Sequence, residues 1–439
     1  MKKLLVFGLI AAFFLPLNIV QRGAVGKEAI KVAYGWSTND DLVSAVREGV
    51  TSLKKGLEGK TPQWVLLFST VGYHPEEVLG QLNQLLPPGV QIQGETSCSG
   101  VMTRDGYHQG RIGSLALLGI WCPRMSFGVG ACSLKEVKTP REVGREAVLR
   151  AIEKVQRGKG ELPKLVFISP SSVGNEEDIL AGIEDVWGRG KVPIFGGAAG
   201  DDKIEGKWRV FANDKVYSDG VVLTLIYTDM GVGYTDMKLG YAFLSGFEPT
   251  DRKAAITKAK GRVIYEFDHQ PAGEVYNRWI GGRLSDKLNQ GGNILLDTNL
   301  DPLGEKIGRF SYLLIHPKEF HPQDRSLEVF ARVKEGSELF LMRGDRKMLV
   351  TRAGLAARLA RSRGRIPKED VAGGILIYCA GTMLAIPENE RGKMASEVND
   401  ALGNTPFIGA FTFGEQGFFS GGINRHGNLM VSMIVFSKK

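Results

Sequence analysis

Acidic side chains occur in three short stretches of similar sequence, each of which reads as a buried strand running into a glycine-containing loop. Residues 90–100 (VQIQGETSCSG), 192–202 (VPIFGGAAGDD) and 405–415 (TPFIGAFTFGE) align without gaps, so that Gly94, Gly196 and Gly409 coincide. A carboxylate at the mouth of such a loop can receive an ammonium group or a metal ion, and glycine lets the backbone approach a ligand closely. The alternative is that the acids cap turns, which aspartate does well.

The acids in these stretches are Glu95, Asp201 with Asp202, and Glu415. The glycines of the middle stretch could present backbone amides to a carboxylate, as glycine-rich turns do for anions, or simply form a tight turn. Taken together, the residues predicted to bind a ligand are Glu95, Thr96, Cys98, Gly196, Gly197, Asp201, Asp202, Cys379 and Glu415.

Two of the four cysteines, Cys98 and Cys379, are candidate nucleophiles. A reactive thiolate needs a nearby histidine, cation or helix N-terminus, and the sequence places none beside either cysteine. His108 could reach Cys98 only across a turn. We therefore interpret both as buried or ligand-lining thiols and assign no catalytic residue. If the chain is exported, one disulfide could form, and Cys122 with Cys132 would close the shortest loop.

The sequence predicts no metal, no cofactor and no nucleic-acid partner. The six histidines show no zinc-binding spacing, and the glycine-rich stretch lacks both the phosphate-loop lysine and the dinucleotide-binding pattern. A net charge of +8 and a pI near 9.1 do not by themselves identify a nucleic-acid binder. The densest basic run, residues 358–365, lacks interleaved aromatic residues and is interpreted as a solvated helix end.

The N-terminus has the layout of a secretory signal peptide. Lys2 and Lys3 precede an apolar run from Leu4 to Leu15, and small residues at 24–26 provide a cleavage site. The run is short for a membrane span, which favours a cleaved signal peptide. The alternative is that the N-terminus is not cleaved and anchors the protein, in which case it would be the only contact with a membrane. The predicted location is therefore periplasmic or secreted, with residues 1–26 as the signal peptide.

The elements that position the acidic loops follow one repeated order of strand, helix, strand, helix, loop strand and closing strand. Apolar periodicity predicts this order over residues 31–121 and again over 126–227, with strands 65–69 and 165–169 matching at a lag of 100. Thr139 and Glu142 form a capping box around Pro140, and Asn175 is the predicted N-cap of the next helix.

The last third repeats the second half of the unit, with a strand at 375–379, a helix containing Met394 and Leu402, and a closing strand at 427–436. Its first half is obscured by an insertion at roughly 246–335. We therefore predict an α/β protein whose helix-covered sheets come from repeated strand–helix–strand–helix–strand units packed with pseudo-symmetry, the C-terminal unit carrying a long insertion.

The loop motifs resemble a known family. Residues 94–100 (GETSCSG) and 195–202 (FGGAAGDD) resemble the N-terminal FIST domain, and residues 265–276 (YEFDHQPAGEVY) and 409–415 (GAFTFGE) resemble the C-terminal FIST domain. The resemblance implies a FIST N-like domain at 27–245, containing the two repeat units, and a FIST C-like domain at 246–439. Two positions depart from the family pattern: Thr382 stands where an arginine usually follows the cysteine, and His269 where a glycine usually follows the aspartate.

The resemblance implies a sensory protein that binds a small ligand, with an amino acid as a candidate. Combined with the signal peptide, it predicts an extracytoplasmic ligand-binding protein that passes its signal to a partner protein the sequence does not identify. Two alternatives stay open: a hydrolase using a cysteine or carboxylate on the same scaffold, and a structural or interaction protein without a ligand. A scaffold alone does not decide between them.

Overall fold

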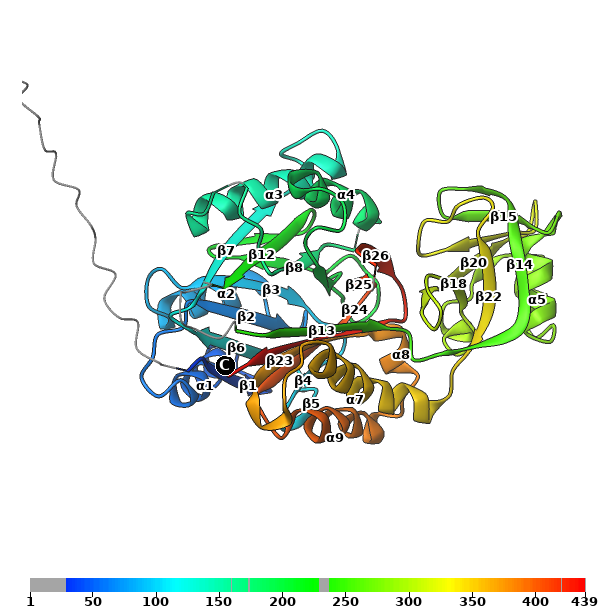
Figure 1. The fold of residues 1–439 in the computed structure, drawn as a ribbon. Coiled ribbons are helices and arrows are strands. Elements are labelled where there is room, and N and C mark those ends of the chain that lie inside the picture. The colour runs from blue at the N-terminus through cyan, green and yellow to red at the C-terminus, as the bar shows by residue number, and fades with distance from the viewer. Residues whose placement is uncertain (1–28, 159, 173, 229–236, 420, 439) are drawn as a thin grey trace, which may run out of the picture.

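The structure is a computed structural model that describes residues 29–158, 160–172, 174–228, 237–419 and 421–438 (Figure 1). The predicted signal peptide, residues 1–26, lies outside these residues. Three six-stranded mixed sheets with helices against them form the main body, and a fourth sheet forms a separate lobe. The predicted α/β class with helix-covered sheets is confirmed.

The first two units contain the predicted strands and helices, but each also has a hairpin between the loop strand and the closing strand, where the sequence predicted only a turn. The first contains β1 (Lys31–Ser37), α1 (Leu42–Gly56), β2 (Trp64–Ser69), α2 (Pro75–Leu85), β3 (Gln91–Thr96), β4 (Val101–Thr103), β5 (Gly106–His108) and β6 (Leu115–Trp121). The second contains β7 (Met125–Cys132), α3 (Pro140–Val155), β8 (Leu165–Pro170), α4 (Glu176–Trp187), β9 (Ile194–Gly197), β10 (Val210–Ala212), β11 (Lys215–Tyr217) and β12 (Val221–Thr228).

The third unit is interrupted by the lobe. It contains β13 (Leu239–Leu244), α7 (Arg346–Arg363), the 3-10 helix η2 (Lys368–Asp370), β23 (Val371–Cys379), α8 (Ala380–Leu384), α9 (Glu388–Leu402), β24 (Phe407–Thr412), β25 (Glu415–Phe419), β26 (Ile423–Gly427) and β27 (Val431–Ser437). The lobe contains β14 (Glu248–Lys260), β15 (Val263–Phe267), β16 (Gln270–Pro271), α5 (Ala272–Trp279), α6 (Ser285–Gln290), β17 (Gly292–Asn293), η1 (Leu296–Thr298), β18 (Leu303–Lys306), β19 (Tyr312–Ile315), β20 (Pro317–His321), β21 (Ser326–Val329) and β22 (Glu338–Arg343).

Local sequence explains where the helices of the second unit begin. Thr139 and Glu142 form the predicted capping box, with Pro140 as the first helical residue of α3. Helix α4 begins at Glu176, directly after the predicted cap, but the Asn175 side chain makes no capping hydrogen bond. Its first turn is acidic instead, which favours a helix N-terminus electrostatically.

The three body sheets share one strand order. They run β1-β6-β2-β3, β7-β12-β8-β9 and β13-β27-β23-β24, and each is completed by a hairpin from another unit. Hairpin β10–β11 of the second unit joins the first sheet, β25–β26 of the third joins the second, and β4–β5 of the first joins the third. The exchange is therefore cyclic. Superposition of the units by pseudo-symmetry stays a prediction.

The aligned glycines occupy corresponding places in these sheets. Gly94 pairs with Leu67, Gly196 with Ile168 and Gly409 with Leu376, each in a parallel pair of strands. A Cβ added to Gly196 would overlap the carbonyl oxygen of Ile168. Glycine is therefore needed where β9 approaches its neighbour closely.

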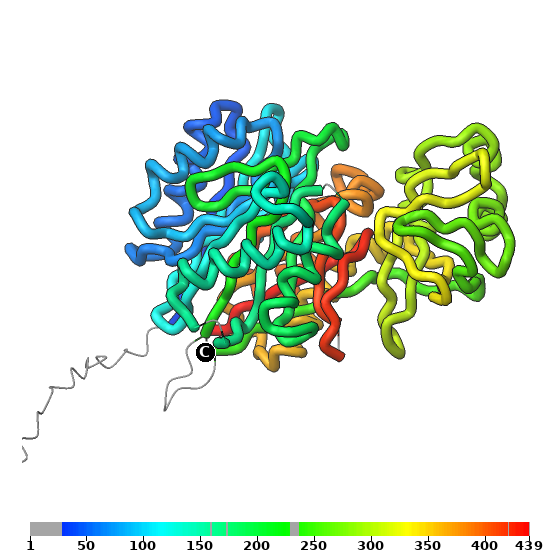
Figure 2. Tube along the Cα trace, turned by 90° about the horizontal axis from the view of Figure 1, so that it is seen from above, coloured from blue at the N-terminus to red at the C-terminus, as the bar shows by residue number. Residues whose placement is uncertain are grey.

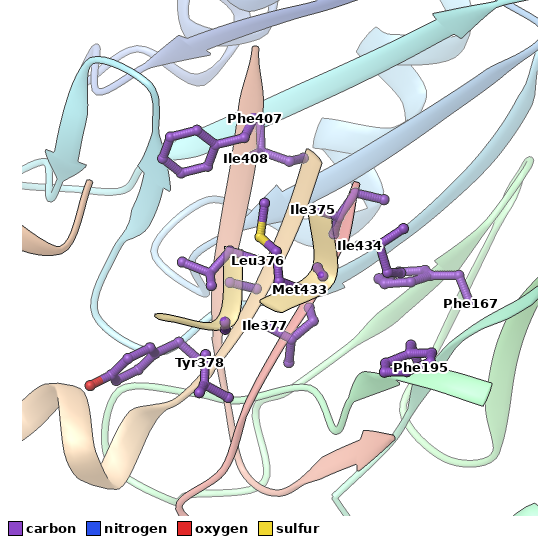
Figure 3. Packing of buried hydrophobic residues seen from close by; sticks show 14 of the residues in the cluster. Phe167, Phe195, Ile375, Leu376, Ile377, Tyr378, Phe407, Ile408, Met433 and Ile434 are labelled. Carbon is purple, nitrogen blue, oxygen red and sulfur yellow. The ribbon is translucent and has the colours of Figure 1, made fainter. Parts of the chain in front are cut away.

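Strands buried on both faces build two kinds of core. In β2, Leu66 and Phe68 belong to the central cluster, whereas Val65 and Leu67 pack with α1 and α2. This alternation follows from the two-residue period of a strand. Figure 3 shows the central cluster, in which Phe167 and Phe195 of the second unit lie near Ile377 and Ile434 of the third. The three sheets thus meet in one apolar core.

The lobe has a core of its own and projects from one end of the body (Figure 2). Ile264, Phe267, Tyr276 and Leu327 belong to this second cluster, which lies apart from the main core. The predicted insertion, 246–335, falls within this part of the chain. In the described residues, no helix is long and apolar enough to cross a membrane.

Candidate functional site

A cavity of about 540 Å³ lies where the lobe meets the body. The body contributes the loop ends after β3, β9, β23 and β24, and the lobe contributes residues around β17, β19 and β21. Because loops leaving the carboxyl ends of parallel strands are where α/β proteins place ligand sites, this position is the expected one. Its size falls in the range of small-molecule sites, about 300–1,000 Å³.

Three of the nine predicted residues line this cavity: Cys98, Asp202 and Cys379. The other six lie in strands or turns behind or beside it. Glu95 and Thr96 are buried in β3, Gly196 and Gly197 end β9, and Glu415 begins β25. Of the predicted acids, therefore, only Asp202 borders the cavity directly.

Asp201 organises its own turn. Its carboxylate accepts backbone N–H bonds from Lys203, Glu205 and Lys207, and the side chain is almost completely buried. Asp202 behaves differently, because one carboxylate oxygen accepts the N–H of Ser99 at 2.7 Å while the residue stays exposed at the cavity. Asp201 therefore performs the turn-capping alternative, and Asp202 is the acid available to a ligand.

Glu415 lies directly behind the cavity wall. It accepts hydrogen bonds from the Thr412 hydroxyl at 2.9 Å and from the backbone N–H of Met430 at 2.8 Å. Burial raises the pKa of this carboxyl to about 8, although these hydrogen bonds oppose the shift. Because Thr412 and Gly414 line the cavity, Glu415 supports the wall without contributing to its surface.

Glu95 is fully buried, and neither carboxyl oxygen has a hydrogen-bond partner. Burial raises the pKa of this carboxyl well above its usual range. It lies in β3 beside Gln93, whose amide donates to the hydroxyl of Ser169 at 3.0 Å. Glu95 thus belongs to the junction between the first and second sheets, not to the cavity.

Both cavity thiols are protonated at neutral pH. Burial raises the pKa of Cys98 to about 11, and burial followed by the charge of Glu415 raises that of Cys379 far above its usual value. His108 does not approach Cys98: it bonds to the Thr103 hydroxyl and stacks on Trp36. All four cysteines are free, so Cys122 and Cys132 are not bridged. Neither cavity thiol has the activation that nucleophilic catalysis requires.

An ion cluster joins the lobe to the body beside the cavity. The Arg262 guanidinium, between β14 and β15, bonds to Glu176 at 3.0 Å and to Glu177 at 2.7 Å. Arg332, which follows β21, makes two bonds to Asp178 and donates its backbone N–H to Glu177. Burial raises the pKa of Glu177, but His426, Arg262 and the Arg332 N–H outweigh it and lower this pKa to about 2. We call Glu176, Glu177, Asp178, Arg262 and Arg332 the interlobe clasp.

Part of the cavity lining is apolar. Trp208 and Phe413 form an edge-to-face pair with ring centroids 6.2 Å apart, and both line the cavity. Ile204, Leu296 and Leu384, from three separate segments, also line it although each is well exposed to solvent. Exposed apolar residues gathered around a cavity indicate a ligand with an apolar part.

Comparison with protein families matches residues 63–270 to the FIST N domain and residues 272–418 to the FIST C domain. The chain belongs to the FIST family. Both parts of the predicted resemblance are confirmed. FIST domains are associated with sensory ligand binding in signalling proteins.

Individual relatives add little to the family match. An uncharacterized protein of Methanocaldococcus jannaschii is 30% identical over 188 residues, which cover 40% of this chain and 33% of that protein. This chain thus matches about a third of that relative's length. A cyanuric acid hydrolase from A. caulinodans has 9% identity and a TM-score of 0.37, covering 93% of this chain and 99% of the hydrolase. PurLQS from Thermotoga maritima has 9% identity and a TM-score of 0.22, covering 93% and 73%. TM-scores this low support no conclusion about the fold or function of this chain.

The cavity lies at the junction of the two FIST segments. Cys98, Asp202 and Arg262 belong to the FIST N match, and His316 and Cys379 belong to the FIST C match. Sequence reasoning missed the lobe residues Arg262 and His316 because each stands alone in the sequence. The acidic first turn of α4, which Arg262 contacts, is favourable at a helix N-terminus without any cation, so it did not point to Arg262.

Proposed function

We propose that this FIST protein is a sensory protein that binds a small ligand in the cavity between lobe and body. An amino acid is the first candidate ligand, and the proposed location is outside the cytoplasm. A separate signalling partner would respond to the bound state.

The observation that supports ligand binding most directly is the composition of the cavity wall. Asp202 offers a carboxylate oxygen that no described residue bonds, which suits the ammonium group of an amino acid. Trp208, Phe413 and Leu296 offer apolar surface to a side chain. Such a mixture of apolar surface and a few polar groups is typical of small-molecule sites.

The state of the cysteines favours binding over hydrolysis. A cysteine hydrolase needs a thiolate with a base or cation beside it, whereas Cys98 and Cys379 are buried, protonated thiols. Glu415 has the raised pKa of a general acid, but it does not line the cavity. We therefore treat the two thiols as part of the ligand surface.

A thermal-shift screen of residues 27–439 against the twenty amino acids tests this proposal. A ligand that binds only the folded state raises the melting temperature, by an amount that grows with its concentration. Asp202→Asn should reduce the shift, whereas Asp400→Asn, on helix α9 away from the cavity, should not. If no amino acid shifts the melting temperature at millimolar concentration, amino acids are excluded as the ligand class.

A further inference from the structure

A histidine and two glutamates converge on the outer face of the lobe. Strands β20 and β21 form an antiparallel hairpin in which Glu319 lies directly opposite Glu328, and His321 lies directly opposite Ser326. Phe320, between Glu319 and His321, belongs to the core of the lobe. Because successive side chains of a strand point to opposite faces, Glu319, His321 and Glu328 share the face that points away from this core.

The three side chains bring potential metal ligands close together. One carboxylate oxygen of each glutamate and one ring nitrogen of His321 all lie within 4.8 Å of one another. His321 Nε2 is 3.4 Å from Glu319 Oε1 and 3.1 Å from Glu328 Oε2. Ligands held tetrahedrally around zinc are about 3.3–3.6 Å apart, since each bond is about 2.0–2.2 Å long. A small adjustment of the side chains would therefore place all three donors around one ion.

The imidazole of His321 is held with Nε2 toward the glutamates. Its Nδ1 hydrogen bonds to the hydroxyl of Ser326 at 3.0 Å, and Ser326 is fully buried, with its backbone N–H bonded to Asp324 at 3.0 Å. An outer hydrogen bond of this kind fixes the orientation and tautomer of a metal-binding histidine. When Nδ1–H donates to Ser326, Nε2 presents its lone pair to both carboxylates.

The cluster carries more negative charge than the side chains around it neutralise. Lys318 Nζ bonds to Glu328 Oε1 at 2.6 Å, which leaves Oε2 facing His321. In the part of the chain that the structure describes, no lysine or arginine forms an ion pair with Glu319. Like charges directly opposite each other in an antiparallel pair are destabilising. A proton on His321 Nε2 would satisfy one carboxylate, whereas a divalent cation can bind all three donors.

We propose that Glu319, His321 and Glu328 form a zinc site on the lobe. One imidazole with two carboxylates suits zinc, whereas Ca²⁺ prefers about 6–8 oxygen ligands and Mg²⁺ an octahedral set of oxygens. The side chains of the three residues are 23–34% exposed, so a fourth position is open to water. Glu328 also lines the cavity, which puts the ion at the edge of the cavity. The site does not depend on the proposed function.

Isothermal titration with zinc chloride tests the proposal on residues 27–439 purified without a histidine tag. We expect saturable binding of one zinc ion per chain and no saturable binding of Mg²⁺ at the same concentrations. Because zinc would bind only the folded hairpin, it should also raise the melting temperature, and EDTA should reverse the rise. Co²⁺ in place of zinc should give the visible absorption of a tetrahedral ion.

Variants assign the ion to these residues. His321→Gln and Glu319→Gln each remove one ligand at similar size and should weaken zinc binding more than about tenfold, and Ser326→Ala, which frees the imidazole, should weaken it about tenfold. His269→Gln is the matched control: this exposed histidine of the lobe has one carboxylate, that of Glu266, at 4.0 Å, so its loss should leave zinc affinity unchanged.

Two results would overturn the proposal. One is the absence of saturable zinc binding to the unmodified protein. The other is zinc binding that His321→Gln and Glu319→Gln leave unchanged, which would place the ion elsewhere on the chain. Circular dichroism of each variant establishes that it is folded, and Glu319→Gln alone decides the question if His321→Gln misfolds. The amino-acid screen is run with EDTA present, so that zinc binding and amino-acid binding are measured separately.

Discussion

The guanidinium of Arg352 donates a hydrogen bond to the hydroxyl of Thr382, the position at which FIST C domains usually carry an arginine. Arg352 comes from helix α7 and is almost completely buried, with its guanidinium carbon 4.3 Å from the centre of the Tyr378 ring. It also donates to the carbonyl oxygens of Ser245 at 2.9 Å and Leu429 at 2.6 Å. A cation from another helix thus reaches position 382, directly behind the cavity wall.

Arg352→Met should lower the free energy of unfolding by about 2–4 kcal/mol, because two buried carbonyl groups lose a charged donor. Urea denaturation measures the loss. Arg358→Met on the same helix is the matched control, since its side chain is half exposed and its contact with Glu397 spans 3.8 Å. Equal stabilities of the two variants would contradict a structural role for Arg352.

Stability should depend on pH through Glu415. Folding raises the pKa of this carboxyl from 4.5 to about 8, so the folded state keeps a proton that the unfolded chain releases. The contribution of this group to the free energy of unfolding therefore falls as pH rises from 4.5 to about 8, by about 1.4 kcal/mol per pH unit at most. Glu415→Gln should flatten this slope in urea denaturation between pH 6.5 and 8. An unchanged slope would show that Glu415 titrates normally.

Removing the interlobe clasp should loosen the lobe. Arg262→Met leaves Glu176, which is 4% exposed, without its cation and should cost about 1–3 kcal/mol. We expect faster limited proteolysis near Phe247 and Gly344, where the chain passes between lobe and body, and weaker ligand binding. Lys253→Met is the control, because its exposed pair with Glu338 lies within the lobe. If the two variants were cleaved at the same rate in limited proteolysis, the interlobe clasp would not be what holds the lobe against the body.

The cavity thiols should react slowly. Cys98 is 1% exposed with a pKa raised to about 11 by burial, and Cys379 is similarly buried with a pKa raised further, so little thiolate exists at pH 7.5. Alkylation by iodoacetamide, followed by mass spectrometry, should be far slower in the native protein than after unfolding in urea. Rapid labelling of either cysteine in the native state would return the hydrolase alternative to consideration.

Export is tested separately from binding. Residues 1–30 fused to a reporter that is active only outside the cytoplasm should produce signal, because they carry the predicted signal peptide. Replacing apolar residues of the run with aspartate, for example Leu9→Asp with Phe13→Asp, should abolish it. A silent reporter together with cytosolic full-length protein would refute the proposed location.

Local sequence patterns predicted the elements of the body well. The apolar periodicity placed β2 and β8, and the Thr139–Glu142 capping box placed the start of α3. The same patterns could not predict which strands pair, because a hairpin such as β25–β26 finds its partner strand β9 far away in the sequence. That pairing depends on the whole core.

The site was predicted less completely, for a related reason. Asp201 and Asp202 are neighbours with the same chemistry, yet one caps its own turn and the other faces the cavity. Glu415 was predicted to contact the ligand, but its side chain is buried behind the cavity wall. His316 has no motif around it, and its place in the cavity wall depends on contacts with Leu295 and Asn428 that only the fold creates.

The cyclic exchange of hairpins has a consequence for how the chain is made. Hairpin β4–β5 leaves the ribosome early, but its partner strand β24 is near the end of the chain. Until β24 has been synthesised, the β4–β5 hairpin has no sheet to join. Likewise, β9 is an unpaired edge strand until β25 has been synthesised. Such distant pairings form slowly, so the three thirds should reach their final state together, late in synthesis. A gene cut near codon 245 would then encode two fragments with incomplete sheets.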